Sequence, residues 1–140
     1  MIEVNNDFES MKPYIDDQQK QNKKEMDRLM KLDHLDEDGY PTEDALDLIT
    51  IWHWDDARGW FEFIKSIWAY RDWGWKEQEV IDEITNKKEW CYYISTAGWS
   101  GNEGIIRAME KNTWMWNTQW VQSRRGGHYI FQLKEFSDAD

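Results

Sequence analysis

The chain has 140 residues, with 17 Lys and Arg against 28 Asp and Glu, a formal net charge of −11, and 11 Trp. This length suits one domain with a substantial core, and the single cysteine excludes an internal disulfide and any cysteine-rich metal site. The sequence shows neither a signal-peptide pattern nor an apolar run long enough to span a membrane, so we expect a cytoplasmic protein with no membrane partner.

The acidic residues concentrate at the front of the chain. Residues 1–50 hold six Lys and Arg against fourteen Asp and Glu, whereas residues 101–140 hold five of each kind. Because phosphate binding needs cations, this distribution disfavours direct nucleic-acid binding by the front half.

Residues 7–32 predict one long helix. Its apolar residues recur at a three-to-four spacing: Phe8, Met11, Ile15, Met26 and Leu29. Polar residues at 18–22 interrupt this stripe. We therefore interpret residues 1–32 as a polar helical arm, and three states stay open for it: loose packing, partial disorder, or homodimerisation through residues 7–32.

Residues 33–47 contain seven acidic residues and no Lys or Arg. A calcium loop does not fit, because placing Gly39 at its sixth position puts His34 first and Ala45 twelfth. One interpretation is a surface turn followed by a helix that Thr42 caps. The other is a negative face that imitates a nucleic-acid backbone and binds a basic groove on a partner protein. Its residues would be Asp36, Glu37, Asp38, Glu43, Asp44 and Asp47.

Three helices are expected next, at residues 43–53, 56–71 and 76–86. Asp55 or Asp56 can cap the second, and a turn is expected at residues 72–75. His53 lies beside these acids, but one His with loop carboxylates makes a poor metal site. We therefore expect neither a metal nor a cofactor.

The last third of the chain predicts strands. Residues 89–96 are rich in aromatic and β-branched side chains, and residues 113–122 alternate with period two. A helix is predicted between them at residues 101–111, with Ser100 and Glu103 at capping-box spacing.

A turn at residues 123–127 precedes a last predicted strand, so residues 113–134 predict a hairpin. The predicted fold class is therefore α+β: a helical N-terminal part, with a long helix and two or three shorter ones, packed on a small C-terminal βαββ sheet. Residues 33–140 would form this single domain.

A polar constellation is expected near the loop before residue 101. Backbone amides at a helix N-terminus attract anions, a basic turn adds charged donors, and an indole can stack on a base. The residues concerned are Trp99, Ser100, Gly101, Asn102, Arg124, Arg125 and His128. No dinucleotide or phosphate-loop glycine pattern occurs, and capping explains Ser100 without an adjacent base, so we assign no catalytic residue.

Four stretches resemble one known family: Gly39–Leu46, Trp73–Trp75, Ile94–Glu103 and Ser123–Tyr129. Together they are similar to small, uncharacterised proteins encoded by bacteriophages and prophages, over residues 35–133. The resemblance implies expression in an infected bacterial cytoplasm, where small acidic products often block host enzymes. The resemblance implies no catalytic or binding residue for this chain.

Two functions stay open. The first is a non-enzymatic inhibitor of a host nucleic-acid enzyme or defence complex, of the anti-CRISPR or anti-restriction kind, whose partner is a host protein with a basic surface. The alternative is binding of a small anionic ligand, such as a nucleotide, by the loop at residues 99–102 and the basic turn. The acidity and the missing catalytic constellation favour the first.

Overall fold

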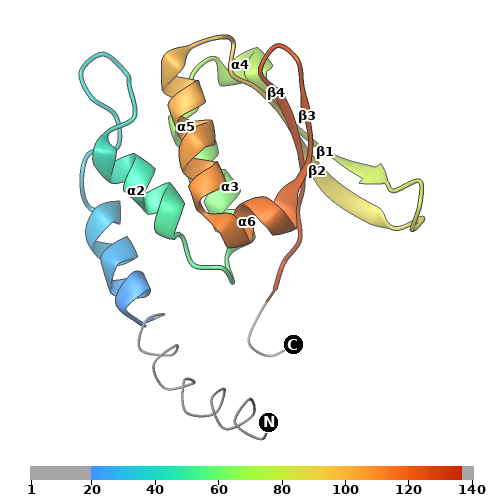
Figure 1. The fold of residues 1–140 in the computed structure, drawn as a ribbon, viewed down its shortest axis with the longest axis horizontal. Helices are drawn as coiled ribbons and strands as arrows, with labels where there is room; N and C mark the ends of the chain where they lie inside the picture. Colours follow the sequence, from blue (N-terminus) through green and yellow to red (C-terminus); the bar gives the residue numbers. More distant parts are fainter. Residues whose placement is uncertain (1–19, 137–140) are drawn as a thin grey trace, which may run out of the picture.

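The computed structural model describes residues 20–136, and it has an α+β fold (Figure 1). After a helical segment at residues 20–30, the helices are α2 (Glu43–Ile51), α3 (Ala57–Ile67), α4 (Arg71–Gly74), α5 (Ser100–Lys111) and α6 (Thr113–Gln119). The strands are β1 (Trp75–Ile81), β2 (Lys88–Ser95), β3 (Trp120–Arg124) and β4 (His128–Gln132). They form one antiparallel sheet in the order β1-β2-β4-β3.

The predicted caps of α2 and α3 are confirmed. The hydroxyl of Thr42 accepts a hydrogen bond from the amide of Ala45 at 3.1 Å, and Asp56 accepts one from the amide of Gly59 at 3.0 Å. Such caps satisfy amides that lack partners within the helix, so a local pattern is sufficient to start both helices.

The predicted helix at residues 76–86 is wrong, because this segment forms β1 and a turn. All seven residues of β1 pair with β2, from Trp75 opposite Ile94 onwards. Asp82 then closes the turn by accepting hydrogen bonds from the amides of Ile84 and Thr85. Pairing with β2, which a local helical pattern cannot reveal, determines this structure.

The predicted strand at residues 113–122 is also wrong over most of its length, since it begins with α6. The Asn112 side chain caps this helix by accepting from the amide of Met115, and it donates to the backbone oxygens of Ile49 and Trp52. These tertiary contacts override the period-two pattern. The sheet region is consequently ββααββ rather than the predicted βαββ, although its last two strands do form the expected hairpin.

Aromatic packing joins α3 to the sheet. The ring of Phe61 stacks on Tyr92 of β2 at a centroid distance of 4.0 Å, and it contacts Phe131 of β4 at 5.6 Å. All three side chains are buried. Large rings that pack in this way supply much of the apolar area that a domain of this size can bury.

Only one face of the sheet is covered in the described part of the chain. Figure 1 shows α3, α5 and α6 on one side of the strands, and the other side is open. Trp75 of β1 and its partner Ile94 of β2 face the helices and are buried, whereas Lys76 and Gln78 of β1 point to the other side and are exposed. We call the uncovered side the open face.

The predicted arm is described only from residue 20. Residues 20–30 are helical, and their Leu29 is buried in the core of the domain. Met26 packs against the same core, and its sulfur lies 3.2 Å from the amide nitrogen of His53. This part of the predicted arm therefore belongs to the domain. Residues 7–19, which carry the rest of the predicted dimerisation stripe, lie outside the described residues.

A carboxylate connects the end of α3 to the first two strands. Glu77 accepts hydrogen bonds from the indole nitrogens of Trp75 at 2.8 Å and Trp90 at 3.2 Å, and its carboxylate lies 3.2 Å from the ammonium of Lys65. Burial acts to raise the pKa of Glu77, but these donors outweigh it, and the pKa lies below its ordinary value of 4.5. The charged form of Glu77 is thus the one that the fold stabilises.

We predict that E77Q lowers the free energy of unfolding by about 1–3 kcal/mol near pH 7, because it removes hydrogen bonds to a charged group. The depressed pKa means that this stabilisation is present above the unfolded-state value of 4.5 and is lost as the pH falls through the native pKa. Urea unfolding of both proteins across this range measures the difference. It should shrink in acid, and a difference that stays constant would contradict this account. E79Q, which removes an exposed acid from the same strand, is the control.

Candidate functional site

The acidic loop, which we define as residues 35–41, is an ordered turn. A β-bridge joins Leu35 to Pro41, and the carboxylate of Asp36 accepts hydrogen bonds from the amides of Asp38 and Tyr40, each at 2.9 Å. Asp36 is therefore needed for the shape of the loop. Glu37 and Asp38 are exposed, and neither forms an ion pair with another described residue.

The other predicted acidic residues lie on α2. Glu43 and Asp47 are exposed, but they line a groove that they share with Arg107 and Lys111 of α5. Cations of the same chain therefore lie near these two carboxylates. Glu37 and Asp38 are consequently the two carboxylates of the predicted set best placed to meet a basic partner.

A row of aromatic side chains starts at the acidic loop. Tyr40 contacts Trp99 at a centroid distance of 4.7 Å, Trp99 contacts Tyr70 at 6.4 Å, and Tyr70 contacts Trp73 at 6.1 Å. Tyr40 is 40% exposed, Tyr70 56% and Trp73 58%. We call these four residues the aromatic ridge. Of these four residues only Trp99 was predicted as a site residue from the sequence, because the exposure of the other three depends on tertiary structure.

The capping box predicted at Ser100 is wrong. Trp99 occupies the N-cap position of α5 without a side-chain cap, and Ser100 is already helical and exposed. The indole of Trp99 lies over Gly101, where any larger side chain would collide with the ring. Gly101 is therefore explained by the close approach of Trp99, and not by an anion.

Asn102 anchors the start of α5 instead. Its side chain is fully buried, accepts from the amide of Ala69 at 3.0 Å and donates to the oxygen of Ala69 at 2.9 Å. This pair of hydrogen bonds ties α5 to the connection between α3 and α4. Because Gly101 and Asn102 are both buried, neither is placed to bind a ligand, and their predicted role in ligand binding is not supported.

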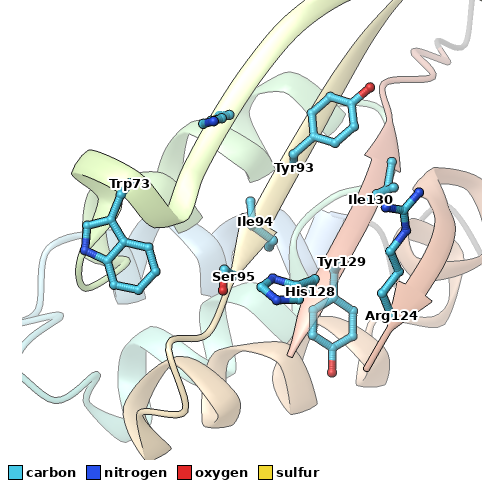
Figure 2. Close-up of a pocket in the computed structure, with 9 residues that line it drawn as sticks. Trp73, Tyr93, Ile94, Ser95, Arg124, His128, Tyr129 and Ile130 are labelled. Atoms are coloured by element: carbon cyan, nitrogen blue, oxygen red, sulfur yellow. The ribbon is translucent and has the colours of Figure 1, made fainter. Parts of the chain in front are cut away.

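The basic turn at residues 123–127 and the neighbouring His128 do not form one site with the loop at residues 99–102. The amide of Thr96 donates to the oxygen of Gly127 at 2.9 Å, so the hairpin turn does approach the start of the loop. Arg124 and His128, however, line a hollow on the open face of the sheet, which we call the sheet hollow (Figure 2). Arg125 and residues 99–102 do not line it.

The other residues that line the sheet hollow, Trp73, Lys76 and Tyr93 among them, were not predicted as site residues from the sequence. Lys76 is on β1, which was predicted as a helix. Residues 75–79 contain only one apolar residue, Trp75, so no apolar alternation in the sequence could have placed Lys76 on the open face.

His53 is paired with a neighbouring carboxylate. Its Nδ1 lies 2.5 Å from the carboxylate of Asp55, and its ring is buried. Among residues 20–136, no three His, Cys, Asp or Glu side chains come together as metal ligands would. The same residues include no helix with both the length and the apolar character to cross a membrane.

No protein family, curated protein or solved structure matches this chain. Any functional assignment therefore depends on the acidic loop, the aromatic ridge and the sheet hollow themselves.

We predict that N102A lowers the free energy of unfolding by about 1–3 kcal/mol, since it leaves partly buried backbone groups of Ala69 without their side-chain partner. S100A should change it by less than about 0.5 kcal/mol, because an exposed side chain without a capping bond contributes little. Urea unfolding of both variants measures the contrast. If S100A lowered the free energy of unfolding as much as N102A, the predicted capping box at Ser100 would be supported after all.

Proposed function

We propose that this protein is a non-enzymatic binding protein that engages a basic surface of a partner protein through the acidic loop and the aromatic ridge. The observation that carries the proposal is the contact of Tyr40 with Trp99, which joins exposed carboxylates to a row of four rings, three of them exposed. Interfaces commonly combine aromatic anchors with a charged rim, and these two surfaces supply both.

The aromatic ridge supports an interface because it exposes rings that a fold normally buries. Tyr70 also has a left-handed backbone, with φ of 60°, which is costly for a residue other than glycine. The amide of Gly74 donates to the oxygen of Tyr70 at 2.8 Å and holds this conformation. In this backbone conformation the exposed ring of Tyr70 lies between Trp99 and Trp73. Strained backbone of this kind is often found at binding sites.

The acidic loop supports the choice of partner. Glu37 and Asp38 lie in a protein of net charge −11, so the field around the loop attracts cationic surfaces and speeds association with them. A basic groove that normally holds phosphates would accept these carboxylates in their place. Together with the resemblance to phage-encoded proteins, this favours a host nucleic-acid enzyme or defence complex as the partner, and inhibition as the outcome.

The charge-reversal variant E37K/D38K tests the proposal. Affinity capture from bacterial lysate, read out by mass spectrometry, should recover a basic nucleic-acid enzyme with the unaltered protein at low salt but not at high salt. E37K/D38K should lose it, because the acidic loop then repels the partner. Asp36 is left intact, since its carboxylate shapes the loop.

The matched control is E79K/E83K, which makes the same change in net charge at exposed acids outside the acidic loop and the ridge. It should keep the partner. Equal capture by both variants would show that the acidic loop is not the interface, and equal loss would show that only net charge matters. Circular dichroism verifies that both variants fold.

A further inference from the structure

The sheet hollow is a second candidate binding site, independent of the acidic loop. It has a volume of about 310 Å³, at the lower end of the range for small-molecule pockets. All four strands contribute to it, through Lys76 of β1, Tyr93 and Ser95 of β2, Arg124 of β3 and His128 of β4. Trp73 of α4 lies at one side (Figure 2).

The strand register explains why these side chains share one face. Lys76 pairs with Tyr93, and Ser95 pairs with His128, which in turn pairs with Arg124. Paired residues point to the same side of a sheet, and Tyr93 and Ser95 are two residues apart on one strand, so both rows lie on the open face. The antiparallel pairing thus gathers cationic side chains from positions far apart in the sequence.

The charge of the sheet hollow is opposite to that of the chain. Its lining includes the basic residues Lys76, Arg124 and His128, but no carboxylate among the described residues. Neither Lys76 nor Arg124 forms an ion pair with another described residue, which is also true of Arg71, Arg107 and Arg125. The sheet hollow is distinguished by having two cations in its lining and no described carboxylate beside them, in a protein with 28 acidic residues, and this favours an anionic ligand.

Aromatic rings add a second kind of recognition. In Figure 2, Trp73 lies on the opposite side of the sheet hollow from Arg124. Tyr93 comes from β2, which lies between the edge strands β1 and β3. Trp73 is 58% exposed and contacts Tyr70, so part of its indole remains accessible to stack on a planar ring. A ligand with an anionic group at one end and a flat ring system at the other matches this arrangement.

We propose that the sheet hollow binds a nucleoside phosphate. Arg124 and His128, which pair across β3 and β4, hold the phosphate by charge-assisted hydrogen bonds, Lys76 of the opposite edge strand adds a second cation to the hollow, and the base stacks on Trp73. This proposal places the ligand on the open face of the sheet, and not at the loop of residues 99–102 where the sequence predicted it.

ATP is the probe, titrated against the full chain by calorimetry, with inorganic triphosphate as the comparison. K76Q/R124Q should weaken ATP binding by about ten- to a hundredfold, because it removes two cations. K87Q/R125Q removes the same charge from exposed residues outside the sheet hollow and should leave the affinity unchanged. W73A should weaken binding of ATP but not of inorganic triphosphate.

Three results would overturn the proposal. They are the absence of ATP binding by the unaltered protein at millimolar concentration, equal weakening by K76Q/R124Q and K87Q/R125Q, and tighter binding of a single-stranded oligonucleotide than of ATP. E37K/D38K should bind ATP normally, so failure of the partner interface and failure of the nucleotide site are distinguishable. Circular dichroism verifies that each variant keeps its fold.

Discussion

The stacking of Phe61 on Tyr92 is the contact on which the rest of the structure depends. It fixes α3 against the central strands, and α5 and α6 lie on the same side of the sheet (Figure 1). Because the core forms on one face only, the alternate residues of every strand face outward. The open face and its hollow are therefore direct consequences of where the aromatic core lies.

The same arrangement separates the two charged surfaces. The acidic loop lies before α2, and the cationic hollow lies across the strands, while the aromatic ridge runs from Tyr40 of the loop to Trp73 at the hollow. Trp73 thus belongs to both proposed surfaces. A nucleotide stacked on Trp73 would cover one ring of the proposed partner interface, and a partner bound there would cover the same ring, so the two ligands would compete for Trp73.

Local signals predicted part of this structure. Thr42 and Asp56 act within their own helices, and residues 89–96 form the expected strand, so these predictions needed no tertiary information. Residues 76–86 and 113–122 failed because β1 depends on β2, and α6 depends on bonds from Asn112 to backbone more than fifty residues away. Arg124 and His128 were predicted as site residues because they flank a turn that is visible in the sequence. Lys76, Tyr40 and Tyr70 were not predicted as site residues, because their position on the open face or their exposure depends on tertiary structure.

Photo-crosslinking from position 40 tests most directly whether the acidic loop and aromatic ridge form a partner interface. A photoreactive phenylalanine analogue in place of Tyr40 should crosslink one basic host protein in bacterial cells, because this ring joins the two surfaces. The same analogue at Ile84, which is 93% exposed in the β1–β2 turn, should not. Crosslinking of the same protein from both positions, or of none from position 40, would contradict the account.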